Sequence, residues 1–319
     1  MNYDGSLQSS GGLPLGPAAQ PPHHITLQNL HQTLRRLGNL GAHFVFEAEH
    51  FGSRYMLFVF SRPNRPKIAV RVQKQYHVPV HPEIVQSMMR REVNVLKKLE
   101  RFRFQYAPRC LAFDISYSNP IQYPFLVLTW AEGERLIWTN DHPAQDLRIR
   151  VMNQLFRIQM ELIDNSLETR ESLTSLGTET AKCFWTRHIH DNMMAAPRGL
   201  PGAGGHPTQE DYWNQLSHLE GILGSGHDDK TYAVAHNNIT YENIIVDEVY
   251  NVECIIGWSH GGVYPLGQAA VLPRILTPDI HQNLVDARRT AEQALDDKAL
   301  YRHWLNIWNL PLTPAKQAM

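Results

Sequence analysis

The spacing of apolar residues changes along the chain, and in the first part it predicts a helix followed by strands. After Thr26, which can cap a helix, leucines recur at helical spacing, so we expect a helix that ends near Gly38 or Gly41. Segments rich in β-branched and aromatic residues follow, separated by short turns. They predict strands over 44–49, 54–60 and 68–72. Because the connections are short, we expect an antiparallel meander.

Helical spacing dominates the rest of the chain. A helix is predicted over 82–99, with a proline near its start and Arg and Lys in its C-terminal half, where the helix dipole favours them. Two strands follow it, over 110–116 and 125–130. Beyond them we expect helices over 147–162, 179–194, 209–223 and 281–307, short strands at 234–235, 244–246 and 252–256, and a mobile Gly- and Pro-rich loop at 197–205.

This order of elements predicts an α+β fold with two lobes. Residues 25–130 would form a small lobe around an antiparallel sheet, and residues 131–319 a larger, mainly helical lobe. Residues 1–24 are rich in Gly, Pro, Ser and Gln and contain too few apolar side chains to offset the entropy lost on ordering. We therefore expect a disordered tail before the first lobe.

Charge and cysteine content narrow the choice of partners. The 319 residues include 30 basic and 31 acidic side chains, so the net charge is −1 and the isoelectric point is near 7.0. No global field attracts nucleic acid or an anionic membrane. Three distant cysteines, Cys110, Cys183 and Cys254, favour free thiols over a disulfide framework or a zinc site. With neither a membrane-spanning apolar run nor a signal peptide, we expect a cytoplasmic protein that binds a small molecule or a protein.

The segment from His236 to Asn243 has the layout of a phosphotransferase catalytic loop. It keeps the His, the spacing and the final Asn of the pattern H-G-D-x-x-x-x-N, but Asn238 stands where that pattern has its aspartate. Fourteen residues after Asn243, Gly257 precedes Trp258 where a metal-binding strand would end I-I-D-W. The loop histidine in such proteins packs and hydrogen-bonds the loop, so we do not expect His236 to act as a base.

Two patterns upstream fit the same class of protein. Residues 68–71, Ile-Ala-Val-Arg, stand where kinases carry V-A-I-K, so Arg71 takes the place of the lysine that holds nucleotide phosphates. Glu92 occupies the position of the helix carboxylate that pairs with that cation, although a solvated glutamate on a charged helix is the alternative. Residues 125–133 have the form of a hinge, an apolar strand that ends in a glycine.

Residues 43 to 276 resemble the aminoglycoside phosphotransferase family, in particular its large fungal branch. The resemblance implies a two-lobed protein-kinase-like fold with a nucleotide cleft, in which ATP phosphorylates a hydroxyl of a small molecule. It also implies that Arg71 meets the phosphates, that Glu92 orients Arg71 and that Asn243 is the surviving metal ligand. The strand-rich lobe would lie on the nucleotide side, with further contacts from the phosphate-loop turn and the hinge, namely Gly52, Ser53, Leu128 and Trp130.

The departures at Asn238 and Gly257 bear on ATP and Mg²⁺ as cofactors. An amide has no basicity comparable to a carboxylate, and hard cations prefer anionic oxygen ligands. Losing both aspartates is expected to impair magnesium-dependent phosphoryl transfer. We therefore expect a pseudokinase-type protein that binds a ligand or partner, or whose cleft serves another small-molecule reaction. An active small-molecule kinase with an atypical site is the alternative.

A second motif overlaps the first. Residues 257–261 satisfy the pattern G-x-S-x-G, which would make Ser259 the nucleophile of a serine hydrolase. Only 60 residues follow Ser259, Pro265 stands where the helix after such a nucleophile should run, and the upstream elements do not alternate between strand and helix. Replacing Asp by Gly in a family segment I-D-W-S-x-x-G creates this pattern by accident, so the hydrolase is a distant alternative.

Overall fold

A computed structural model of the chain describes residues 25–275, with gaps at 39, 41–42, 53–54, 74–81, 140–141, 170–184, 188, 191–192, 194–208, 223–230, 271–272 and 274. The predicted tail 1–24, the loop 197–205, the helix over 281–307, Cys183 and much of the helix expected over 179–194 lie outside the described residues. The chain divides into two compact units. The first unit is Met1–Gln86 with Leu111–Trp130, and the second is Ser87–Cys110 with Ala131–Met319.

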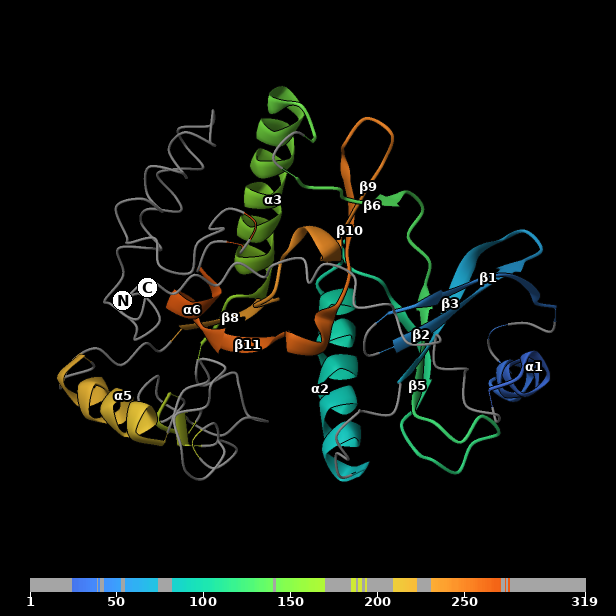
Figure 1. Ribbon diagram of the computed structural model, residues 1–319, viewed down its shortest axis with the longest axis horizontal. Coiled ribbons are helices and arrows are strands. Elements are labelled where there is room, and N and C mark those ends of the chain that lie inside the picture. The colour runs from blue at the N-terminus through green and yellow to red at the C-terminus, as the bar shows by residue number, and fades with distance from the viewer. Residues whose placement is uncertain are drawn as a thin grey trace, which may run out of the picture. The chain divides into compact units, whose positions relative to one another are not determined.

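The first unit is built on an antiparallel sheet (Figure 1). Its first three strands form the predicted meander, which is confirmed, and β5 pairs antiparallel with β3. The strand order is therefore β1-β2-β3-β5-β4, which places the predicted hinge strand beside the strand that carries Arg71. The strands are β1 (Val45–Phe51), β2 (Tyr55–Arg62), β3 (Arg65–Gln73), β4 (Cys110–Asp114) and β5 (Phe125–Thr129).

Helix α1 (Leu27–Arg36) covers one face of this sheet. Its Leu30 and Leu34 are fully buried and join a cluster formed by alternate residues of the central strands, among them Phe60 and Val70. Successive side chains of a strand point to opposite faces, so Arg71 lies on the face that α1 does not cover. The sheet thus separates an apolar core from the face that carries the predicted phosphate-binding residue.

The cap of α1 is a testable local feature. The backbone N–H of Asn29 donates to Oγ1 of Thr26 at 3.2 Å, as the sequence predicted. Replacing Thr26 by Ala is expected to lower the free energy of unfolding by about 1 kcal/mol, because a helix N–H loses its acceptor. Urea denaturation followed by circular dichroism measures the change, with Thr26→Ser as the matched control that keeps the acceptor. Equal losses in both variants would show that the cap does not stabilise α1.

The second unit combines helices with two small sheets of order β10-β9-β6 and β11-β8-β7. The helices predicted over 82–99, 147–162 and 209–223 are confirmed, with slightly different ends. The elements are α2 (Pro82–Arg101, whose first turns belong to the first unit), α3 (Gln145–Ser166), α5 (Gln209–Ile222), α6 (Leu266–Ala269), β6 (Glu134–Arg135), β7 (Glu168–Thr169), β8 (Thr231–Ala235), β9 (Ile244–Val246), β10 (Val252–Ile255) and β11 (Gly262–Pro265).

Gly133 lets the chain after the hinge approach β9. Its φ is +110°, and a Cβ added there would lie 2.4 Å from the carbonyl oxygen of Val246. Only glycine avoids that overlap and adopts this backbone conformation without strain. The next residues then pair with β9 as β6, and the N–H of Leu136 donates to the carbonyl of Ile244 at 2.9 Å. The hinge glycine therefore ties the chain to the strand that follows the predicted catalytic loop.

Helix α3 supports the strands on both sides of that loop. On β8, the N–H of Val234 donates to Oγ of Ser166 at 2.8 Å. On β10, the N–H of Val252 donates to Oε1 of Gln154 at 2.8 Å. In both bonds a backbone N–H of a strand donates to a side chain of α3. These bonds fix the position of the strand before the loop and of the strand that returns to it. The loop is held on a rigid scaffold.

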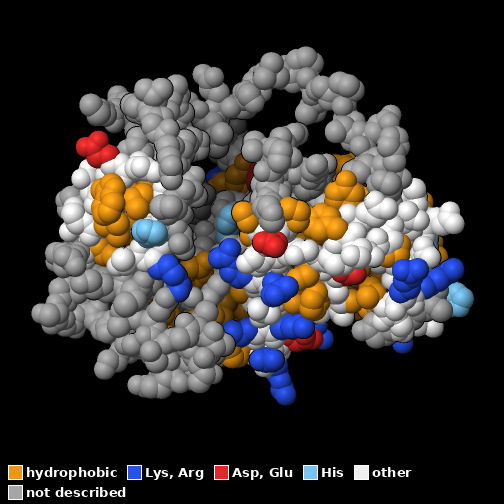
Figure 2. All heavy atoms as spheres, turned by 90° about the horizontal axis from the view of Figure 1, so that it is seen from below, with side chains coloured by type: hydrophobic (Ala, Val, Ile, Leu, Met, Phe, Trp, Pro, Cys, Tyr) orange, Lys and Arg blue, Asp and Glu red, His pale blue; other side chains and the backbone are white. Residues whose placement is uncertain are grey.

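Charge is unevenly distributed over the surface. Figure 2 shows Lys and Arg side chains gathered near the middle of one face, with few Asp and Glu side chains among them. Within the second unit, α2 contributes the exposed residues Arg90, Arg91 and Arg101. None of the helices that the structure describes is long and apolar enough to cross a membrane. The near-zero net charge therefore conceals local positive regions.

Candidate functional site

The predicted catalytic loop and Gly257 lie together in the second unit. Strand β8 ends at Ala235, the loop follows, and a short 3-10 helix, η3 (Tyr241–Asn243), leads into β9. Strand β10 then returns antiparallel to β9, and the N–H of Ile256 donates to the carbonyl of Asn243 at 2.8 Å. This hairpin places Gly257 next to Asn243, so the two motifs singled out in the sequence form one site.

His236 is locked in a neutral form. Its side chain is 2 % exposed, and its Nδ1 lies 3.2 Å from the backbone N–H of Asn238, which can only donate. Nε2 therefore carries the ring proton and donates it to the carbonyl of Ile256 at 2.8 Å. Burial lowers the pKa of His236 to about 4, since a charged ring would lose its hydration. With both ring nitrogens engaged, His236 has the structural role expected from the sequence.

Trp258 packs against the His236 ring and supports its position. It is 1 % exposed, and its ring meets the His236 ring edge to face, with 4.6 Å between centroids. The Phe104 ring also meets the Trp258 ring in an edge-to-face contact, with 6.2 Å between centroids. The indole Nε1 donates to the carbonyl of Ile255 at 2.7 Å. Three aromatic rings thus fix the position of the loop histidine, and the sequence offered no signal for the part played by Phe104.

Asn243 fastens the loop and also fills the space beside Gly257. Its Nδ2 donates to the carbonyl of Asn238 at 2.8 Å, which leaves Oδ1 directed toward Gly257. Gly257 has φ +82° and ψ 37°, and a Cβ added there would lie 2.6 Å from that Oδ1. Real Cβ atoms do not approach so closely. The volume in which a side chain at position 257 would begin is therefore occupied by the amide of Asn243.

Asn238 contributes to the loop through its backbone. Its N–H donates to His236, and its carbonyl accepts from Asn243 and, at 3.1 Å, from the N–H of Thr240. The side chain brings a neutral amide to the position where a base is expected. Among the residues that the structure describes, no group of three or more His, Cys, Asp or Glu side chains is arranged to hold a metal ion.

The predicted phosphate-binding residues lie in the first unit. Arg71 stands on β3 and is 7 % exposed, with its guanidinium carbon 4.4 Å above the centre of the Tyr55 ring. This is a cation–π contact, and it orients the guanidinium. Gly52 lies in the turn between β1 and β2, where its N–H donates to the carbonyl of Tyr55 at 2.9 Å. Ser53 lies outside the described residues.

The hinge residues belong to the same unit. Leu128 is buried and pairs with Ala69 across β3 and β5. The N–H of Trp130 donates to the carbonyl of Lys67 at 3.1 Å, and its ring stacks on His50 at 5.8 Å between centroids. The structure therefore places both residues at the C-terminal end of β5, and their contact with a nucleotide stays a prediction.

Glu92 is not the solvated glutamate that the sequence left as an alternative. It lies on α2 in the second unit and is 2 % exposed. An ionisable group buried to that extent requires polar or charged neighbours. Its pairing with Arg71, which belongs to the first unit, stays a prediction.

Ser259 does not have the geometry of a nucleophile. It is 6 % exposed and lies within the 3-10 helix η4 (Trp258–His260), which leads into β11 and not into a long helix. A hydrolase nucleophile stands exposed at the tip of a strand-to-helix turn. His236 is committed to other partners. The burial of Ser259 therefore does not fit the exposed nucleophile that the hydrolase alternative requires.

Tyr264, which the sequence did not single out, contacts Asn237 of the loop. The Tyr264 hydroxyl donates to the carbonyl of His260 at 3.1 Å, and burial raises its pKa. Asn237 hydrogen-bonds Tyr264 and has φ +59°, a conformation that Asn tolerates better than most residues. An Asn in a loop between strands was the available signal for this left-handed position.

Comparison with known proteins gives a fold-level result. No family model matches the sequence, and neither does any curated protein. A solved structure of a candidate aminoglycoside phosphotransferase from Ralstonia eutropha JMP134 is similar with a TM-score of 0.56 and 12% identity, covering 90% of this chain and 82% of that one. The ethanolamine kinase of Plasmodium vivax is similar with a TM-score of 0.50 and 10% identity, covering 86% of this chain and 73% of that one.

Proposed function

We propose that this chain, which has the α+β kinase-like fold of the aminoglycoside phosphotransferases, is a pseudokinase-type protein that binds a nucleotide without magnesium-dependent phosphoryl transfer. One observation carries the proposal. The Oδ1 atom of Asn243 lies where a side chain at Gly257 would begin, so the site is shaped around the missing carboxylate. The chain would act through its bound ligand, through a protein partner, or in small-molecule metabolism.

The donor set does not fit Mg²⁺. This ion requires near-octahedral oxygen coordination and is held in kinases by a carboxylate as well as an amide. Asn238 and Asn243 offer only neutral amide oxygens, and Gly257 stands where the carboxylate would be. An amide at Asn238 cannot accept the proton of an attacking hydroxyl. Asn238 and Asn243 therefore provide neither an anionic metal ligand nor a base.

ATP remains the proposed ligand. The similar structures are named as phosphotransferases and kinases, which supports a nucleotide. Arg71 keeps its charge at any accessible pH, and its fork suits phosphate oxygens. A nucleotide could thus be held by arginine and by the hinge strand with no metal ion.

The proposal is tested by thermal denaturation with ATP in the presence of Mg²⁺ or of EDTA. We expect ATP to raise the melting temperature equally in both, because the proposed site holds the nucleotide without a metal ion. Binding to the folded state stabilises it by about 2.7 kcal/mol when the ligand concentration is a hundredfold above Kd. Phosphate release should not exceed the blank. A shift that requires Mg²⁺, or release that saturates with ATP, would support the active kinase with an atypical site.

Matched arginine variants locate the nucleotide. Arg71→Gln is expected to reduce the shift caused by ATP, measured against the melting temperature of the variant itself. Arg90→Gln, at an exposed position of α2, is the control and should leave the shift unchanged. Equal shifts in both variants would contradict the assignment of Arg71 to the phosphates.

A further inference from the structure

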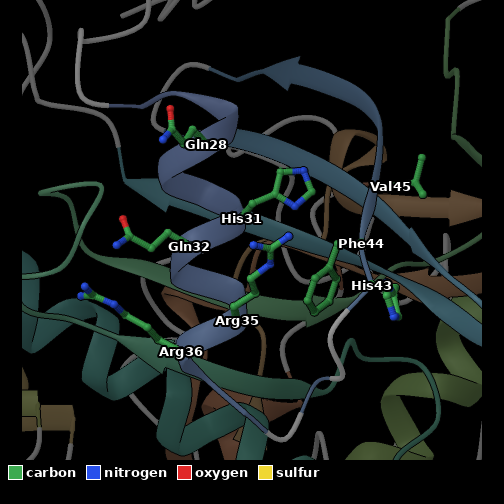
Figure 3. A pocket seen from close by; sticks show the side chains of 8 residues that line it. All are labelled: Gln28, His31, Gln32, Arg35, Arg36, His43, Phe44 and Val45. Carbon is green, nitrogen blue, oxygen red and sulfur yellow. The ribbon is translucent and has the colours of Figure 1, made fainter.

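An open hollow of about 730 Å³ lies between α1 and the start of β1, within the first unit. Figure 3 shows that His31 and Arg35 point toward the start of β1, near His43, whereas Gln28, Gln32 and Arg36 extend along the outer side of the helix. Phe44, which is buried, and the first residue of β1 complete the lining. Its volume is in the range of sites for small molecules.

The helical repeat explains why these side chains meet. Leu30 and Leu34 bury one side of α1 against the sheet, so the polar residues are left on the other side. Residues four apart lie one above the other on a helix, which aligns Gln28, Gln32 and Arg36, and likewise His31 with Arg35. The polar residues therefore form two rows. His31 and Arg35 face the start of β1, and Gln28, Gln32 and Arg36 lie along the outer side of the helix (Figure 3).

The lining contains cations and amides but no carboxylate. Of the eight described residues around the hollow, two are arginines, two are histidines and two are glutamines. The nearest acidic residue along β1 is Glu47, which forms an ion pair of 3.0 Å with Lys67, and the hydrogen bond from Lys67 lowers its pKa. Its charge is therefore compensated outside the hollow, which leaves a positive surface.

The helix dipole accounts for only part of this pattern. Arg35 and Arg36 lie in the last turn, where a cation is favoured in any helix. The dipole explains neither His43, which comes from the segment before β1, nor the two amides, Gln28 and Gln32, that lie nearer the helix N-terminus. Side chains that can donate hydrogen bonds to an anion therefore line the hollow from two separate segments.

We propose that this hollow binds a phosphate-bearing anion, at a site separate from that of the nucleotide. Arginine forks bind phosphate oxygens through two parallel hydrogen bonds, and Gln amides and His N–H groups can donate to the remaining oxygens. The open shape suits either a free polyphosphate or the phosphates of a lipid headgroup. The two sources share the chemistry that the lining recognises.

The test is a titration of the full chain with inorganic pyrophosphate, followed by calorimetry. We expect saturable binding that weakens with salt, and a loss of affinity of at least about tenfold in the Arg35→Gln/Arg36→Gln variant, since hydrogen bonds to charged groups are lost. Arg90→Gln/Arg101→Gln removes the same charge from exposed positions of α2 and should bind pyrophosphate like the wild type.

Two further measurements decide the interpretation. The shift in melting temperature caused by ATP should be the same in the Arg35→Gln/Arg36→Gln variant as in the wild type, which separates this site from the proposed function. Sedimentation with phosphatidylcholine vesicles, with and without a phosphatidylinositol phosphate, distinguishes a lipid headgroup from a free anion. The proposal is overturned if neither pyrophosphate nor these vesicles bind, or if both arginine double variants bind them equally.

Discussion

Lowering the pH from 7 to 5 is expected to remove about 2 kcal/mol from the free energy of unfolding through His236 alone. The folded protein holds this ring neutral down to a pKa of about 4, whereas the usual value is 6.5. Between pH 6.5 and about pH 4, His236 binds a proton in the unfolded chain but not in the folded chain. The contribution of His236 to the free energy of unfolding is therefore fully present above pH 6.5. It declines as the pH falls, and about 3 kcal/mol is lost at pH 4.

Urea denaturation at a series of pH values measures this effect as a difference between variants. The chain has 17 histidines, so the wild-type curve alone is a composite. His236→Gln keeps a hydrogen-bonding side chain without a titratable ring, and it should show a smaller loss of stability between pH 7 and pH 5. His43→Gln, at an exposed position, should follow the wild type. Parallel curves for the wild type and His236→Gln would show that His236 is not held neutral by the fold.

Restoring both aspartates, by Asn238→Asp with Gly257→Asp, is expected to destabilise the protein by about 3 kcal/mol and not to restore ATP hydrolysis. A side chain at position 257 must adopt a left-handed backbone, and its Cβ would meet Oδ1 of Asn243 at 2.6 Å. Asn243 can move only by giving up its hydrogen bond to the carbonyl of Asn238. The total destabilisation therefore combines the backbone strain at position 257 with the loss of the Asn243 hydrogen bond.

Two measurements test this expectation. The free energy of unfolding is compared with that of Gly257→Ala, which adds the same Cβ without a carboxylate and should account for most of the loss. Phosphate release from ATP is then followed with and without Mg²⁺. Magnesium-dependent release by the double variant would show that the site is that of a kinase that has merely lost two carboxylates, and the proposed remodelling around Asn243 would be wrong.

Much of the fold could be predicted because its main elements carry long periodic signals. Helix α1 shows leucines at helical spacing and a capping Thr26. Strands β2 and β3 are rich in aromatic or β-branched residues and are separated by a short turn. Strands β6, β7 and β11 were not predicted. They contain two, two and four residues, too few to show a period, and β6 forms where Gly133 lets the backbone approach β9.

The site was predictable as a set of positions but not as a geometry. The spacing of His236, Asn243 and Gly257 indicated that they belong to one site, and the β9–β10 hairpin brings them together. The tautomer of His236 and the direction of the Asn243 amide depend on backbone groups far along the chain, such as the carbonyl of Ile256. No local pattern reports those contacts. The missing side chain at Gly257 was visible, but the amide that fills its place was not.

The loop closed by Asn243 has a consequence for how such proteins change over evolutionary time. The side chain of Asn243 bonds the backbone of the same loop and that of His236 bonds the backbone of Ile256, so we expect selection for a folded chain to retain both residues after any reaction has ceased. Asn238 takes part through its backbone, which any residue supplies, so drift acts there first. A genome survey that recognises phosphotransferases by the loop histidine and asparagine therefore counts inherited architecture together with working enzymes.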